Sequence, residues 1–391
     1  MSNYDLLIIG AGPAGTVAGL VAARAGARVC ILDRSSFPRH KLCGDSVNPG
    51  AMATLARLGV AADVESRGLP VDGMIVTGDG ASVAGLYPRG LRGRSIRRSD
   101  LDWILLRAAI AAGCRFEPGV AVRRAVVDDT SNGPAIGHVE IARRSGVAAM
   151  RAPAVIAADG RRSALGFALG FLRHPARPRR WAIGGYFSGV AAPGVVHSSD
   201  GVVGEMHIRK DRYVGVAPIP DGLTNVCLVR QFAPGDPAIR DPASLLRGAI
   251  ESDSALRARF TAATAIAEPV VLGPLAVDST GRASIAGLLF AGDAAGFIDP
   301  MTGDGLHFAI RGGELAAEAA LQALAHGWRG VHDRHAAARA AAFGAKCRFN
   351  RALRSVVASP VAISLGGVGA RLMPAALRAI VARAGDCDQA A

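Results

Sequence analysis

Several features are scarce in this chain of 391 residues, and each scarcity excludes a class of protein. Aromatic residues make up 5% and do not interleave with the arginine-rich runs at 92–98 and 173–180, so we expect no nucleic-acid binding. No apolar run reaches the roughly 18 residues of a membrane-spanning helix, so no transmembrane segment is expected. The six cysteines are scattered without metal-site spacing, which indicates reduced thiols, a cytoplasmic location and no bound metal. No signal-peptide pattern opens the chain.

Apolar residues and positive charge are both plentiful. Hydrophobic residues make up 50% of the chain, enough for a large core and, from the length, two or three domains. The formal net charge of +13 comes mostly from arginines spread along the chain. Three interpretations stay open for it: a solvated surface, attraction to an acidic cofactor or phosphorylated substrate, or a peripheral contact with anionic lipid.

The N-terminal 33 residues have the pattern of a dinucleotide-binding βαβ unit. A buried strand is predicted at 5–9, a helix at 14–25 and a second apolar strand at 28–32, which Asp33 follows. The turn between the first strand and the helix reads Gly-x-Gly-x-x-Gly over 10–15. Glycines there allow a tight turn and close approach of a pyrophosphate to the helix N-terminus, and the acid can accept ribose hydroxyls. A lone glycine triad is weak evidence, but this context makes it strong.

Two further segments place an aspartate after a short apolar strand. Asp159-Gly160 follows a strand at 155–157 and by itself is as consistent with a simple turn. Asp293 follows a strand at 288–291 and precedes a glycine-containing turn and a helix at 306–325. The second aspartate can bind a ribityl or ribose hydroxyl, and the turn can hold phosphate or the edge of a flavin ring. A helix at 101–112 is also predicted, with Ser99 as its N-cap.

These segments resemble the flavoprotein superfamily of p-hydroxybenzoate hydroxylase-like monooxygenases, geranylgeranyl reductases and flavin-dependent halogenases. Within it, the chain is most similar to the geranylgeranyl reductases. Residues 37–44 match their Pro-x-x-x-x-Cys-Gly segment, 292–305 match their Gly-Asp-Ala-Ala-Gly run, and 213–225 match a Tyr-x-x-x-x-Pro-x-x-x-Gly-x-x-Asn strand pair. The Trp-x-Trp-x-Ile-Pro motif of the halogenases is absent from the sequence.

The resemblance implies a bound FAD and assigns residues to it. Catalytic roles fall to Cys43, as proton donor or substrate-positioning group, and to His307 at the start of the long helix; each also has a purely structural interpretation. The substrate pocket would include Trp181, Tyr213 and Pro218, for which core packing is an equal alternative. The residues expected to bind FAD are Gly10, Gly12, Pro13, Ala14, Gly15, Asp33, Arg34, Lys41, Cys43, Gly44, Arg98, Asp159, Gly292, Asp293, Pro300, Gly303, Asp304 and Gly305.

The implied fold is of the α/β class, with a discontinuous Rossmann-like FAD-binding domain. Its parts are expected at 1–70, 96–170 and 276–330. An inserted mixed β-sheet substrate domain would take 71–95 and 171–275, with an antiparallel sheet at 182–229. A helical C-terminal tail would follow at 331–391.

The sequence leaves the reaction open between three hypotheses. Reduced FAD could reduce a carbon–carbon double bond of a hydrophobic isoprenoid or polyketide-like molecule, which we narrowly favour. Alternatively, NAD(P)H-reduced FAD could react with oxygen and hydroxylate an aromatic or lipid-like substrate, or the chain could be a non-catalytic FAD-binding accessory protein. No second glycine-rich βαβ unit is visible, so the electron donor would be transient NAD(P)H, reduced ferredoxin or a quinol.

Overall fold

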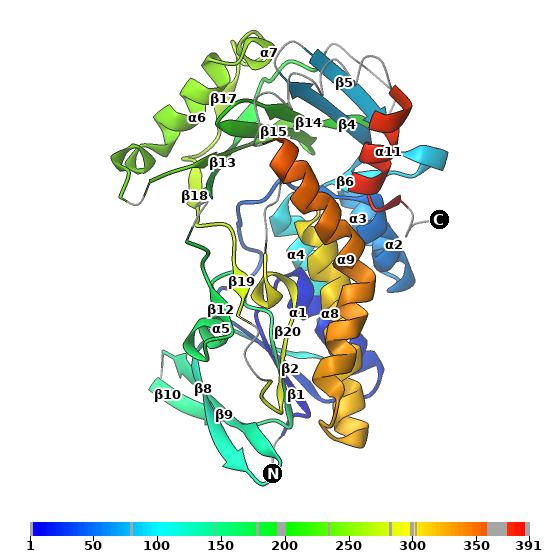
Figure 1. The fold of residues 1–391 in the computed structure, drawn as a ribbon, viewed down its shortest axis with the longest axis vertical. Coiled ribbons are helices and arrows are strands. Elements are labelled where there is room, and N and C mark those ends of the chain that lie inside the picture. Colours follow the sequence, from blue (N-terminus) through cyan, green and yellow to red (C-terminus); the bar gives the residue numbers. More distant parts are fainter. Residues whose placement is uncertain are drawn as a thin grey trace.

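The computed structural model describes residues 3–78, 81–144, 146–176, 180–193, 201–233, 235–280, 284–297, 301, 303–357 and 374–387. Its base is a five-stranded parallel sheet in the order β20-β11-β1-β2-β7 (Figure 1). The strands are β1 (Leu6–Ile9), β2 (Val29–Asp33), β7 (Arg115–Pro118), β11 (Ala154–Ala157) and β20 (Leu288–Phe290). Because segments distant in the sequence share this sheet, the predicted discontinuous Rossmann-like core is confirmed.

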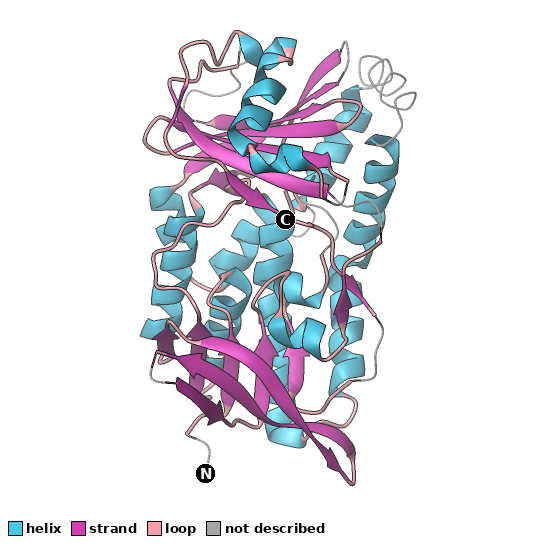
Figure 2. Cartoon of the chain, turned by 90° about the vertical axis from the view of Figure 1, so that its left-hand side faces the viewer, coloured by secondary structure: helices cyan, strands magenta, loops and turns pink. Residues whose placement is uncertain are grey.

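The parallel sheet is covered on both faces, which explains why its strands are continuous apolar runs. Leu6 and Ile8 face the helices α1 (Pro13–Arg24), α4 (Arg98–Ala111) and α8 (Gly305–His326). Leu7 and Ile9 point to the opposite face, as alternate residues of a strand must. A three-stranded antiparallel sheet and the short helix α5 cover that face (Figure 2). These elements are β8 (Ala121–Thr130), β9 (Gly133–Arg143), β10 (Gly146–Met150) and α5 (Ala164–Ala168).

A second, larger sheet lies above the parallel sheet (Figure 1). Its order is β17-β13-β16-β15-β14-β4-β6-β3, with β18 on β13 and β5 on β4. The bounds are β3 (Ser46–Val47), β4 (Leu69–Gly78), β5 (Ala81–Leu86), β6 (Gly93–Ser95), β13 (Arg180–Ser188), β14 (Val202–Ile208), β15 (Arg212–Ile219), β16 (Leu223–Gln231), β17 (Thr264–Ala265) and β18 (Val270–Leu272). The expected antiparallel arrangement holds from β13 to β14, but β14 pairs with β4 in parallel, so the sheet is mixed.

The two faces of the upper sheet have different partners. On the far face, Ile183, Val214 and Leu228 form a core with α6 (Pro242–Glu251) and α7 (Ser254–Arg257). On the near face, Ala182, Tyr213 and Val229 cluster with Met301, which belongs to the segment that leads into α8. The near face therefore looks onto the end of the parallel-sheet domain at which its strands finish.

The helix predicted at 101–112 begins earlier than expected, and the predicted N-cap is wrong. Helix α4 starts at Arg98 after an N-cap at Arg97, which makes no side-chain capping bond. The Asp45 carboxylate, from a distant loop, accepts the Arg98 backbone N–H at 3.2 Å. A tertiary contact thus satisfies a first-turn N–H for which the sequence had suggested Ser99.

The C-terminal part is helical where the structure describes it. Helix α9 (Val331–Val357) runs alongside α8, and α11 (Pro374–Ala384) packs against β5 (Figure 1). The remaining described elements are α2 (Pro49–Arg57), α3 (Ala61–Arg67), β12 (Leu172–Arg173), β19 (Asp278–Ser279), η1 (Pro88–Gly90), η2 (Pro237–Arg240) and η3 (Gly292–Ala295). Of the helices described, none combines the length and the apolar character that crossing a bilayer requires.

Candidate functional site

The carboxyl ends of the parallel strands bring the predicted cofactor segments together. The glycine-rich turn follows β1, Asp33 ends β2, Asp159 and Gly160 follow β11, and Gly292 follows β20. Parallel strands end at one edge of their sheet, and ligands of open α/β sheets bind there. Segments separated by more than 250 residues therefore share one edge.

Each glycine of the turn meets a different steric demand. Gly10 has a φ of +101°, which side chains rarely adopt. A Cβ on Gly15 would lie 1.8 Å from the Gly10 carbonyl oxygen, so helix α1 could not pack here with any other residue. A Cβ on Gly12 would meet only the Arg39 guanidinium, at 3.4 Å. Pro13 opens α1 and Ala14 packs beneath Gly292, so these two residues position the turn.

Asp33 shapes the glycine-rich turn directly. One of its carboxylate oxygens accepts the Ala11 N–H at 2.8 Å and the other accepts the Ser35 N–H at 2.8 Å. Each oxygen keeps a further lone pair, so a ribose hydroxyl could still donate to it. Arg34 is exposed, and its charge acts on Asp159 across the sheet edge.

Four cations gather at this edge. Arg98 is held by two hydrogen bonds to the fully buried Asp102, at 2.8 and 3.0 Å, and Arg39 lies 3.3 Å from the same carboxylate. Burial, then the charge of Arg98, lowers the pKa of Lys41, and Asp293 only partly opposes this. Burial, then Arg162, lowers the pKa of Arg161 to about 10. The lowered pKa values come first from burial and then from neighbouring arginines, so Lys41 and Arg161 are desolvated cations that lie close to like charges.

Asp159 adds a buried acceptor beside the same turn. One carboxylate oxygen accepts the Ala164 N–H at 2.9 Å, whereas the other is buried with no hydrogen-bond partner in the chain. Burial raises the pKa of this carboxyl. A diphosphate would pair with the buried cations, and a hydroxyl of a nucleoside or ribityl group would satisfy the orphaned oxygen. The residues present therefore fit a dinucleotide such as FAD.

Cys43 lies at the junction between this edge and the upper sheet. The Arg98 guanidinium is within hydrogen-bond reach of the Cys43 sulfur. The Asn225 amide donates to the Cys43 carbonyl at 2.8 Å and to the Asp45 carboxylate at 2.6 Å. The Tyr186 hydroxyl donates to the same Asp45 oxygen at 2.8 Å. Sequence reasoning missed Asp45 and Tyr186, and it noted Asn225 only as the end of a motif.

The predicted pocket residues do not lie together. Tyr213 belongs to the near-face cluster, packed with Leu42 and Met206. Trp181 belongs to the far-face core, and a Cβ on Gly273 would fall 2.2 Å from its ring. Pro218 also points away from the Tyr213 face, because residues an odd number apart on a strand face opposite ways. Only Tyr213 of the three therefore lines the side that faces the cofactor edge.

Contacts to α9 and α2 hold in place the turn that precedes α8. Asp304 is buried, and its carboxylate lies 3.0 Å from Lys346 Nζ and accepts the Asn350 amide at 2.8 Å. His307 is also buried, between Gly50 of α2 and the ring of Phe343 on α9. These two side chains thus position the turn from its outer side. Gly303 lies on the turn beside Met301, Gly305 is the first residue of α8, and Pro300 lies outside the described residues.

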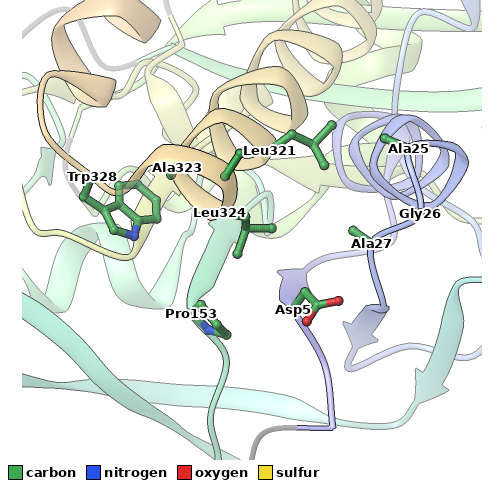
Figure 3. A pocket seen from close by; sticks show the side chains of 10 residues that line it. Asp5, Ala25, Gly26, Ala27, Pro153, Leu321, Ala323, Leu324 and Trp328 are labelled. Carbon is green, nitrogen blue, oxygen red and sulfur yellow. The ribbon is translucent and has the colours of Figure 1, made fainter.

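Two hollows are found on the described surface. One of about 650 Å³ lies between the ends of α1 and α8 and is lined by Asp5, Pro153, Leu324 and Trp328 (Figure 3). Asp5 and Pro153 precede β1 and β11, so this hollow is at the opposite edge of the sheet from the glycine-rich turn. Another of about 460 Å³ lies between η3 and α9 and is lined in part by Gly292, Asp293, Asp304 and Gly305, so it borders the predicted cofactor segment. In the described ranges no group of His, Cys, Asp and Glu side chains is placed to hold a metal ion.

The glycine-rich turn, its ordering acid and the cations gathered at the carboxyl edge together define a dinucleotide-binding protein. The FAD binding domain family matches residues 3–347, which is most of the chain. The protein belongs to this family and is an FAD-dependent oxidoreductase.

Characterised relatives narrow the type of enzyme. The chain is 30% identical over 332 residues to a menaquinone reductase of Mycolicibacterium smegmatis, covering 81% of this chain and 76% of that one. It is 30% identical over 335 residues to digeranylgeranylglycerophospholipid reductase 2 of Methanopyrus kandleri, covering 82% and 78%. The resemblance to geranylgeranyl reductases is thereby confirmed. A flavin-dependent brominase structure superimposes with a TM-score of 0.84 at 19% identity, over 98% of this chain and 95% of that chain, which shows a shared fold.

Proposed function

We propose that this enzyme reduces a carbon–carbon double bond in a hydrophobic isoprenoid or polyketide-like molecule. The observation that carries the proposal is the apolar near face of the upper sheet, where Tyr213, Met206 and Leu42 lie beside Met301 and above the cofactor edge. An apolar surface with few polar groups suits contact with a long hydrocarbon chain. Two relatives named as reductases of menaquinone and of a digeranylgeranyl lipid support the same substrate class.

In this proposal the cofactor lies along the carboxyl edge of the parallel sheet. Arg39, Lys41 and Arg161 would hold its diphosphate together with the first turn of α1, and Asp159 and Asp293 would accept its hydroxyls. FAD, when bound and reduced, supplies a hydride. Gly44 is exposed with open space around its α-carbon, so the chain can pass close to a flat ring there.

Cys43 is proposed as the proton donor. Its thiol would protonate the substrate carbon that does not receive the hydride. Arg98, at hydrogen-bond reach of the sulfur, would stabilise the thiolate left behind. The bond from Asn225 to the Cys43 carbonyl fixes the backbone, so the sulfur stays at the border of the apolar face. His307 keeps only a positioning role, since it packs between α2 and α9.

The remaining assignments follow from the same placement. The FAD-binding domain would comprise 1–70, 96–170 and 276–330, and the substrate domain 71–95 and 171–275, with 331–391 as a helical tail. NAD(P)H would reduce the flavin transiently, without a dinucleotide domain of its own. The net charge of +13 would favour a peripheral contact with anionic lipid, from which a cytoplasmic enzyme could take a hydrophobic substrate.

The test uses the purified holoenzyme, reduced with dithionite without oxygen and mixed with menaquinone or a digeranylgeranyl lipid. We expect flavin reoxidation to follow the appearance of a product that has gained two hydrogen atoms. Failure of both compounds to reoxidise the flavin, together with incorporation of an oxygen atom when air is admitted, would replace the reductase with a monooxygenase. An FAD-loaded protein that turns over neither way would be a binding protein.

A further inference from the structure

The hollow of about 460 Å³ between η3 and α9 contains basic and aromatic side chains that the proposed reduction does not use. Arg339, Phe343 and Asn350 recur at spacings of four and seven residues along α9, so they lie on one face of this helix. Helix α8 contributes Gly305 and Phe308, whose ring packs edge-on against Phe343. The hollow is therefore formed by η3 together with two helices that pack against each other.

Arg339 presents a cation without a counter-ion to this hollow. Its Nη1 nitrogen is buried and has no hydrogen-bond partner among the described residues. Burial lowers the pKa of Arg339, and no carboxylate is among the groups that oppose this lowering. The guanidinium carbon lies 5.6 Å from the centre of the Phe343 ring, which supports it from one side. A desolvated cation with an unsatisfied donor is costly, so the position suits an anion from outside the chain.

The Arg339 guanidinium lies beside the cofactor segment. The point at which a Cβ of Gly312 would stand is 3.4 Å from Arg339 Nη1 and 3.6 Å from the Gly292 nitrogen, so the lack of a side chain there leaves both groups close together. Phe297 lines the same hollow and also packs against the near-face cluster. A ligand bound to Arg339 would therefore adjoin both the cofactor segment and the near face.

The other charges of the hollow also favour an anion. Arg348 and Arg351 line it from exposed positions of α9. Two acids line it as well, but Asp304 is compensated by Lys346 at 3.0 Å, and the charge of Asp293 acts on cations of the cofactor edge. Three guanidinium groups together suit an anion that offers several acceptor oxygens.

We propose that Arg339, Arg348, Arg351 and Asn350 form an anion site that binds the phosphate or diphosphate group of a second ligand while FAD occupies the carboxyl edge of the parallel sheet. Phosphate oxygens would accept the guanidinium N–H groups in the forked geometry that arginine favours. Asn350 Oδ1 is a buried acceptor with no partner among the described residues, and a hydroxyl or a protonated phosphate oxygen of the same ligand would donate to it. Two ligands of an FAD-dependent reductase can carry such a group: a nicotinamide dinucleotide and a substrate with a phosphorylated head.

A calorimetric titration of FAD-loaded enzyme with inorganic pyrophosphate tests the anion site. Saturation with FAD keeps the probe out of the diphosphate site of the cofactor. We expect Arg339→Met to raise the dissociation constant about tenfold, because charge-assisted hydrogen bonds are lost while an apolar chain remains against Phe343. Arg348→Met, at an exposed position, should raise it about threefold. The control is Arg334→Met, which removes the same charge from an exposed position of α9 outside the hollow and should leave the dissociation constant unchanged.

Three outcomes would overturn the anion site. The wild type could fail to bind pyrophosphate, or Arg339→Met and Arg334→Met could weaken binding equally, which would show that only the net charge of the chain matters. Arg339→Met could also lose FAD, which would place Arg339 in the cofactor site. If Arg339→Met does not fold, Arg348→Met decides, and a dissociation constant equal to that of Arg334→Met rejects the site. No turnover is measured, so these results do not depend on the double-bond reduction.

Two further titrations of the oxidised, FAD-loaded enzyme identify the source of the phosphate. One uses NADP⁺ and the other geranylgeranyl diphosphate, each with the wild type, Arg339→Met and Arg334→Met. A dissociation constant that rises about tenfold in Arg339→Met for NADP⁺ alone identifies the electron donor, and a rise for geranylgeranyl diphosphate alone identifies the substrate. If Arg339→Met and Arg334→Met bind each compound equally well, the hollow serves neither ligand and the proposal is rejected.

Discussion

Loss of the buried Lys346 side chain should destabilise this fold. It is 2% exposed on α9, and its ammonium lies 3.0 Å from an Asp304 carboxylate oxygen and 3.2 Å from one of Asp386. It also donates to the carbonyls of Arg383 and Ala384, at 2.5 and 2.8 Å. One cation thus joins the turn before α8 to the segment that follows α11.

The expected cost follows from burial. Lys346→Met keeps the volume of the side chain but leaves two carboxylates, also 2% and 4% exposed, without their cation. Removing one partner of a buried ion pair costs about 3–5 kcal/mol, because the remaining charge is neither solvated nor paired. Lys210→Met, at an exposed position, should stay within about 0.5 kcal/mol of the wild type.

Urea unfolding followed by circular dichroism measures this difference, and limited proteolysis reports whether the C-terminal segment detaches first. Adding Asp386→Asn to Lys346→Met removes one of the uncompensated charges, so the double variant should recover part of the lost stability. Asparagine suits the φ of +52° at this position. A Lys346→Met protein as stable as Lys210→Met would refute the reasoning, since it would show that the carboxylates are solvated.

Three further predictions concern the site. Gly12→Val should lose FAD but keep its circular dichroism, because the new side chain meets only the Arg39 guanidinium; Gly248→Val, with open space around it, should stay yellow. Cys43→Ser should lower turnover and retain FAD, and Cys347→Ser serves as the control. If the two variants turn over at the same rate, Cys43 has only a structural role. Relative to Asp45→Asn, the wild-type free energy of unfolding should fall by about 2 kcal/mol as pH rises from about 4 to 6, since the folded carboxyl holds its proton to higher pH. A difference between the two proteins that stays constant with pH in urea titrations would contradict this.

The sequence predicted correctly those features that depend on residues close together in the chain. The strand–turn–helix–strand unit at 5–33 could be read directly, because its glycines, apolar runs and acid act on one another within one turn or strand. The Ser99 cap failed because the competing acceptor, Asp45, comes from another loop. The prediction that Trp181 and Pro218 line the same pocket as Tyr213 was wrong. The face to which a strand residue points depends on its position in the strand, which the presence of aromatic residues does not reveal.

The pairing of Asp45 with Tyr186 could not have been found this way, since the two residues are 141 positions apart and neither belongs to a motif. Arg98, in contrast, was predicted from the sequence as an FAD-binding residue, and in the structure it makes several different contacts. Its guanidinium is neutralised by the buried Asp102, so it adds little net charge for a diphosphate. The guanidinium also reaches the Cys43 sulfur, and the Arg98 backbone N–H donates to the Asp45 carboxylate, so both contacts lie towards the upper sheet. Arg98 therefore couples the cofactor edge to Cys43, the proposed proton donor, and its replacement should disturb both together.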